Sequence, residues 1–131
     1  MIYHFHEDGS KPALDEYFVF GSNMSGIHGA GAARVAWEHY GAEVGNGFGL
    51  QGRSYAIPTK GYEIEYIPLH EFVEEIYKFV EFTQKEENAY KGWFVTRIGC
   101  GLAGFLDEEI APHFKGAKNC SFAREWEKYL V

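Results

Sequence analysis

The sequence predicts an α/β domain in which strands alternate with helices around a mixed or parallel sheet. Short apolar runs typical of buried strands occur at residues 17–20, 54–57 and 93–98. Apolar side chains such as Phe72 recur at helical spacing over residues 70–88, with charged side chains between them. The first and third of the apolar runs lead into glycine-rich stretches, as strand-to-helix turns do.

The N-terminal half predicts a sheet edge, a buried strand and a helix. Gly9 and Pro12 mark the loop that follows the first strand, and Gly41 is a plausible C-terminal stop for the helix. The expected order is an edge strand, a loop, a buried strand, a helix and a glycine-rich loop, at residues 1–5, 7–15, 17–20, 29–40 and 45–52.

The C-terminal half predicts two further strands and three helices. We expect Pro58 to end the strand at 54–57, and residues 62–67 to form a strand or an extended loop. Asp107 and Ser121 are candidate caps for two short helices. The expected order after residues 62–67 is a helix, a strand and these two helices, at residues 70–88, 93–98, 107–114 and 121–130.

Composition excludes several classes of protein. A chain of 131 residues suits one domain, and its net charge of −7 argues against nonspecific binding to nucleic acid, which needs a basic surface. A small anion remains compatible, because backbone dipoles bind anions on acidic proteins. Two cysteines, Cys100 and Cys120, favour a reducing cytoplasmic location over a disulfide scaffold. No apolar run approaches the ~18 residues of a membrane span, and no signal peptide is evident.

The two glycine-rich stretches, residues 20–33 and 97–105, indicate a ligand. Glycines at a strand-to-helix turn let the backbone approach a ligand and point its N–H groups at an anion, and a helix N-terminus adds partial positive charge. Two such turns suggest a diphosphate held from both sides, as in a nucleotide. Because ligands bind beyond the carboxyl ends of strands in α/β sheets, we expect these turns and the loop after Ile57 to converge on one cleft.

The spacing of the motifs resembles that of macro domains. The first stretch has the pattern Asn-x-x-Gly-x-x-Gly-x-Gly-x-Ala from Asn23, the second reads Ile-Gly-Cys-Gly-Leu-Ala-Gly-Phe from Ile98, and Tyr-Ala-Ile-Pro-Thr-Lys lies between them from Tyr55. Together they are similar to small phage and bacterial macro-domain-like proteins, nearest to the branch of ADP-ribose glycohydrolases that carries a lysine. The resemblance spans residues 17–126.

This resemblance implies a three-layer α/β/α fold with a mixed central sheet and a site for ADP-ribose. It implies catalytic positions at Asn23 and Lys60, near the distal ribose. His28 is a further catalytic candidate because it lies inside the first loop. Lys60 would attack the anomeric carbon, or act as a fixed positive charge there. The resemblance implies ligand contacts at Ser22, Gly26, Gly29, Ala30, Gly31, Thr59, Gly99, Cys100, Gly101, Leu102, Ala103, Gly104 and Phe105. We expect no cofactor and no metal.

The activity that the resemblance implies has alternatives. An enzyme would hydrolyse an ADP-ribosyl bond or remove the phosphate of ADP-ribose 1″-phosphate. A non-catalytic reader or sponge would only hold an ADP-ribose-type or NAD-derived signal, and a third alternative is another nucleotide on a similar scaffold. Alanine at position 103, where the lysine-dependent glycohydrolase has an aspartate, favours the reader, whereas Lys60 favours the enzyme. If the protein is encoded by a phage, its location would be the host cytoplasm.

Overall fold

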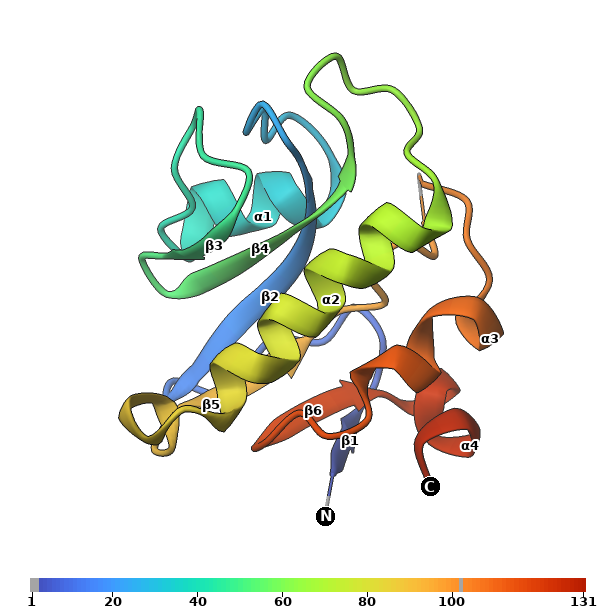
Figure 1. Ribbon diagram of the computed structural model, residues 1–131. Helices are drawn as coiled ribbons and strands as arrows, with labels where there is room; N and C mark the ends of the chain where they lie inside the picture. The colour runs from blue at the N-terminus through green and yellow to red at the C-terminus, as the bar shows by residue number, and fades with distance from the viewer. Residues whose placement is uncertain (1–2, 102) are drawn as a thin grey trace.

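A six-stranded mixed sheet forms the centre of the protein in a computed structural model that describes residues 3–101 and 103–131 (Figure 1). Its strand order is β1-β6-β5-β2-β4-β3, and every neighbouring pair is parallel except β3 with β4. The predicted α/β class with a mixed sheet is therefore confirmed. The strands are β1 (His4–His6), β2 (Glu16–Asn23), β3 (Gly49–Gln51), β4 (Ser54–Lys60), β5 (Gly92–Val95) and β6 (Cys120–Ala123).

In the described part of the chain, four α-helices flank the sheet, and they differ in length. α2 is the longest and α1 is the next, whereas α3 and α4 are single turns. The bounds are α1 (Gly31–His39), α2 (Leu69–Gln84), α3 (Asp107–Ile110) and α4 (Glu127–Leu130), with 3₁₀ turns at Glu86–Asn88, Ala111–Phe114 and Arg124–Trp126.

The two faces of the sheet carry separate apolar cores. On one face, α2 and the C-terminal helices bury a large cluster that includes Phe79, Trp93 and Trp126. On the other face, α1 alone packs through Ala33 and Ala36 onto Phe18, Phe20, Ala56 and Phe94. Small side chains on α1 let this helix lie close to β2, and side chains alternate between the faces along β2. Helices thus cover both faces of the sheet, but one face has only a single helix.

The C-terminal segment corrects one prediction. Residues 121–130 do not form one helix capped by Ser121; they complete β6 and then turn through a 3₁₀ turn into α4. Ser121 lies in β6 and its hydroxyl bonds His6 Nδ1 at 2.7 Å. The pairing partners of β6 are β1 and β5, which lie far away in the sequence, so a local pattern does not reveal this strand.

Other boundaries also differ from the prediction. β4 continues through Pro58 to Lys60, and Pro58 is the register partner of Ser22, next to a shift in the pairing with β2. Asp107 is the first residue of α3 rather than its cap, because its carboxylate bonds Arg97 and Trp126 instead. β3 lies within the expected glycine-rich loop, and the α-helix from Leu69 ends at Gln84. Residues 62–67 form a loop that joins β4 only at the Lys60–Tyr66 bridge.

Candidate functional site

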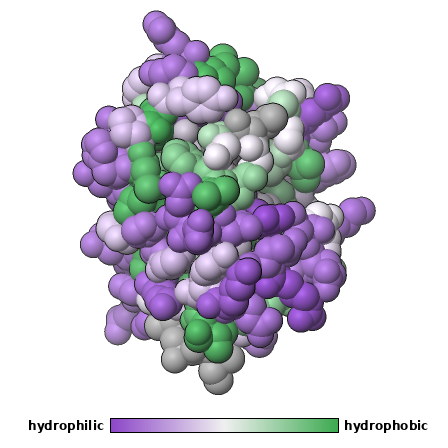
Figure 2. Space-filling model, turned by 90° about the vertical axis from the view of Figure 1, so that its right-hand side faces the viewer, coloured by the Kyte–Doolittle hydropathy of each residue, from purple (hydrophilic) through white to green (hydrophobic). Residues whose placement is uncertain are grey.

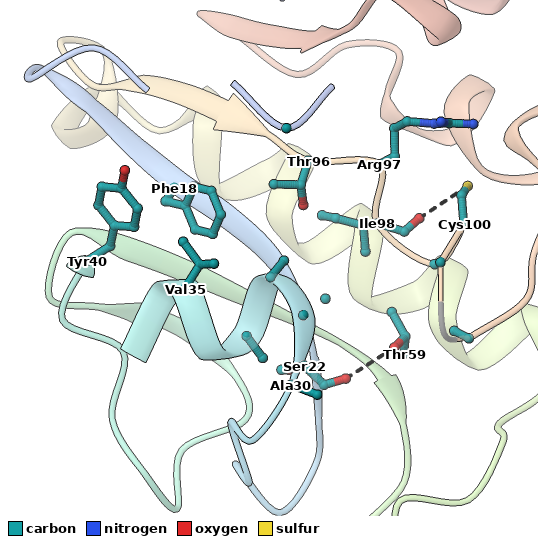
Figure 3. A pocket seen from close by; sticks show the side chains of 18 of the residues that line it. Phe18, Ser22, Ala30, Val35, Tyr40, Thr59, Thr96, Arg97, Ile98 and Cys100 are labelled. Carbon is teal, nitrogen blue, oxygen red and sulfur yellow. Dashed lines mark hydrogen bonds between the residues drawn. The ribbon is translucent and has the colours of Figure 1, made fainter. Parts of the chain in front are cut away.

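A cavity of about 870 Å³ lies at the carboxyl ends of β2, β4 and β5, where the three predicted loops meet. The first glycine-rich loop, the end of β4 and the turn after β5 all line it (Figure 3). These strands are adjacent and parallel, so their ends fall at one edge of the sheet. On the face shown in Figure 2, pale and green residues gather in the upper half, toward this end of the molecule.

Asn23 at the end of β2 organises the first glycine-rich loop. Its Oδ1 accepts hydrogen bonds from the backbone N–H of Ile27 and from the hydroxyl of Ser25, both at 2.9 Å. Its Nδ2 donates to the carbonyl oxygen of Ile27 at 2.8 Å. Asn23 lines the cavity and is buried. The amide therefore holds the turn in shape, in addition to any contact with a ligand.

The rest of this loop divides into cavity wall and support. Gly29, Ala30 and Gly31 line the cavity, and α1 begins there without a side-chain cap, so its first N–H groups face the open space. Gly26 lies outside the lining; a Cβ at Gly26 would come within 2.2 Å of the backbone nitrogen of Asn46. Gly26 therefore allows two loops to touch.

His28 is placed away from the reacting position that the resemblance implies. It is buried behind the loop and is not among the cavity-lining residues. Its Nε2 lies 2.9 Å from the carbonyl oxygen of Glu43 and 3.1 Å from that of Asn46, and its ring meets Phe20 edge-on. His28 therefore ties the first loop to residues 43–46.

The second glycine-rich loop lines the cavity through Gly99, Cys100, Gly101 and Ala103. Gly99 has a φ of +81°, and a Cβ there would lie 2.5 Å from the ring of Phe72, so only glycine fits. Leu102 lies outside the described residues. The predicted contacts Gly104 and Phe105 do not line the cavity.

Two side chains near this loop face the interior. Phe105 packs on Phe72, with ring centroids 5.5 Å apart, and so supports the loop from below. Burial, together with the nearby Asp107, raises the pKa of the Cys100 thiol to about 12. The thiol is therefore almost fully protonated at ordinary pH, which disfavours a role as a nucleophile.

Thr59, Ser22 and Lys60 form the wall between the two loops. The Thr59 hydroxyl donates to the carbonyl oxygen of Ser22 at 3.2 Å, and the Ser22 hydroxyl donates to that of Gly47 at 2.6 Å. Lys60 is the register partner of Asn23 and lines the cavity, with its Nζ 5.2 Å from the ring centroid of Tyr66. The structure thus brings Asn23 and Lys60 together at one end of the cavity.

Arg97, which opens the second loop, is the hub of an ion-pair cluster. Its guanidinium bonds Asp107 at two points, 2.6 and 3.1 Å, and its Nη1 lies 3.3 Å from both Asp8 and Glu125. Asp107 also accepts from the indole N–H of the buried Trp126 at 2.7 Å. The cluster fixes the loop against α3, the C-terminal 3₁₀ turn and the segment after β1.

Sequence reasoning missed the second half of the cavity. Residues 8–12 after β1 form part of its wall, and four rings line it as well, those of His6, Phe18, Tyr40 and Phe94. A signal for the rings was present, since phenylalanines alternate along β2 at Phe18 and Phe20. The loop at 8–12 carried no motif.

The charge of the lining differs from that of the whole protein. Among the described lining residues, the cations Lys11, Lys60 and Arg97 outnumber the carboxylates, of which Asp8 is the one present. The chain as a whole carries −7. Because Arg97 is already paired with Asp107, Asp8 and Glu125, the positive charge offered to a ligand comes from Lys11 and Lys60. These lysines and the open backbone at the glycine turns make the cavity suited to an anion.

The described part of the chain shows neither a metal-binding cluster of side chains nor a membrane-spanning helix. Residues 3–101 and 103–131 hold no group of three or more histidine, cysteine or acidic side chains arranged to bind a metal ion. Within the same residues, no helix combines the length and apolar character that crossing a bilayer requires.

No family model, curated protein or solved structure matches the chain.

Proposed function

We propose that this protein is a macro-domain-like module that binds ADP-ribose or an ADP-ribosyl group. The observation that carries the proposal is the meeting of two glycine turns from the adjacent strands β2 and β5 across one cavity. The uncapped start of α1 lies on one side and the backbone around Gly99 and Gly101 on the other, which suits a diphosphate held from both sides.

The charge balance supports the same ligand class. Lys60 brings positive charge to the glycine end, on a protein that is otherwise acidic, whereas the charge of Arg97 is already paired with Asp107, Asp8 and Glu125. An acidic surface disfavours long nucleic acid backbones, whereas a local cationic pocket accepts a small diphosphate. The proposal therefore concerns a small nucleotide or a single ADP-ribosyl group on a larger molecule.

Within this ligand class, the geometry favours holding the ligand over cleaving it. The side-chain amide of Asn23 is engaged in the loop, and His28 lies outside the cavity. Ala103 supplies no carboxylate, and Asp107 is bound to Arg97. A reader or sponge of an ADP-ribose-type signal is thus the main proposal.

Hydrolysis is the second candidate, favoured by the position of Lys60. Lys60 lines the cavity beside Asn23, where the distal ribose would lie if the diphosphate bridges the glycine turns. An amine there would act on an ADP-ribosyl bond or on ADP-ribose 1″-phosphate, as a nucleophile or as a fixed charge.

Calorimetric titration with ADP-ribose tests the main proposal. We expect micromolar binding that weakens in Lys60→Ala, with the exposed Lys115→Ala as the matched control outside the cavity. NAD and nucleoside phosphates serve as competitors. Stronger binding of one of these would move the proposal to another nucleotide, and no binding of any would remove it.

Release of ADP-ribose from ADP-ribosylated protein or DNA, followed by chromatography, decides between the two candidates. A hydrolase would lose turnover in Lys60→Ala while the fold remains intact. A reader would bind the modified substrate and release nothing in either form.

A further inference from the structure

We propose that the base of the bound nucleotide lies along α1, against a row of four aromatic rings, and is held by its faces rather than by a carboxylate. This inference rests on the proposed function, because it assigns the second half of the same cavity. The rings are those of Tyr40, Phe18, Phe94 and His6, and all four line the cavity.

The aromatic row crosses the sheet from one element to the next. Tyr40 stacks on Phe18 with centroids 4.7 Å apart, and Phe18 is the register partner of Phe94, 6.1 Å away. His6 stacks on Phe94 at 3.7 Å, and all three pairs are within 19° of parallel. The row thus brings together aromatic side chains of β2, β5, β1 and the residue that follows α1.

The row lies where the sheet is least covered. α1 is the one helix on this face among those described. Phe18 and Phe94 belong to its small core cluster and are only 5% and 3% exposed, and they border the cavity together with the half-buried His6 and Tyr40. Because neighbouring rings of the row stack on one another, the row offers ring edges to the cavity. Edge-to-face contact with a planar base is a favoured aromatic geometry, and it is sequence-tolerant because every base has a π-face. The row is therefore suited to a planar base.

The cavity is continuous from the glycine turns to the aromatic row. Phe94 and then residues 96–101 line it as β5 leads into the second loop. On α1, Gly31, Val35 and His39 recur every four residues and so form one lining stripe. His39 lies about 12 Å along the axis from Gly31, at about 1.5 Å per residue. A diphosphate at the turns can therefore place its base beside the row.

The carboxylate nearest this half of the cavity is already engaged. Asp8 Oδ2 accepts a hydrogen bond from Arg97 Nη1, and Figure 3 shows Arg97 apart from Phe18 and Tyr40. A base over the row would therefore meet rings and the side chain of Val35, and the carboxylate nearest to it is already paired. Adenine and hypoxanthine should then bind almost equally, since they differ at the exocyclic amine.

Variants that fill the cavity beside the row test the inference. Val35→Trp places a large neutral side chain in the lining stripe of α1, and Val44→Trp makes the same change at an exposed position outside the cavity. The probes are ADP-ribose, its hypoxanthine analogue and ribose 5-diphosphate, which has no base. Affinity is measured by calorimetry, with ribose 5-diphosphate as a competitor of ADP-ribose, and thermal unfolding checks each variant.

We expect Val35→Trp to weaken ADP-ribose about tenfold and to leave competition by ribose 5-diphosphate unchanged. Val44→Trp should match the unmodified protein, and Tyr40→Leu should behave like Val35→Trp. The hypoxanthine analogue should bind within about threefold of ADP-ribose.

Three outcomes would overturn the inference, and only the last touches the proposed function. Equal affinity of ADP-ribose for all variants would place the base elsewhere. Strong preference for adenine over hypoxanthine would mean that an edge of the base is read. If neither ADP-ribose nor its analogue binds the unmodified protein, the proposed function and this inference fall together.

Discussion

The guanidinium of Arg97 donates two hydrogen bonds to the carboxylate of Asp107, and these join the second glycine loop to the first turn of α3. Both side chains are largely shielded from water, and the same carboxylate accepts from the buried indole of Trp126. The geometry of the glycine loop is thus tied to the C-terminal core.

Asp107→Asn should destabilise the fold by about 2 kcal/mol, because charge-assisted hydrogen bonds to Arg97 and the bond to Trp126 are weakened together. Urea unfolding at neutral pH measures the loss, and the exposed Glu108→Gln is the control for charge. Equal stability of the two variants would show that the contact is dispensable.

The same carboxylate predicts an acid limit of stability. Burial alone would raise the pKa of Asp107, but the hydrogen bonds from Arg97, Trp126 and Cys100 outweigh it and lower this pKa below its ordinary 3.8. Its contribution is present above that value and is lost as the pH falls through the folded pKa. Acid unfolding followed by fluorescence should begin at higher pH in Asp107→Asn.

Gly26 and Gly29 should respond in opposite ways to alanine. Gly26 has a φ of +72° and no room for a Cβ, so Gly26→Ala should cost about 2 kcal/mol or more. Gly29 has open space beside it and lines the cavity, so Gly29→Ala should keep the fold and weaken ADP-ribose binding. Thermal unfolding and titration on both variants check this contrast, which equal melting temperatures would contradict.

His6 should make the protein less stable in mild acid. Burial lowers the pKa of His6 from its ordinary 6.5 and outweighs the carboxylates of Asp8, Glu125 and Glu7, which raise it. The unfolded chain then binds a proton more readily, so this contribution is complete above 6.5 and declines as the pH falls below it. Denaturant unfolding from about pH 7.5 to 5.5 should show the decline. His6→Asn should flatten it and the exposed His4→Gln should not.

Cys100 should resist alkylation although it borders the cavity. Its pKa of about 12 leaves almost no thiolate at pH 8. Mass spectrometry after iodoacetamide treatment should show little modification in the folded protein and rapid modification in urea. Fast labelling of the folded protein would mean that the thiol is activated.

The sequence predicted the position of the candidate site better than it predicted the strands at the edge of the fold. Local residue types predicted the turns after Phe20 and Ile57 and the turn at Gly99. Adjacent parallel strands then bring these turns together. The strand at Cys120 was missed because its partners lie far away in the chain.

Individual roles were harder to predict than positions. Nothing local distinguishes Gly26, which faces another loop, from Gly29, which faces the cavity. His28 shares the loop with both, yet its ring turns toward the carbonyls of Glu43 and Asn46. Such differences depend on contacts between distant segments, which one sequence does not record.

The unequal covering of the sheet has a thermodynamic consequence. α1 alone leaves part of one face as open cavity, so a molecule lodged there would complete a layer that the chain does not supply. Ligand binding would then stabilise the whole cooperative unit against unfolding, and the melting temperature should rise with ligand concentration, as mass action requires. The melting temperature of this small protein would thus report the concentration of any ligand that fills the cavity.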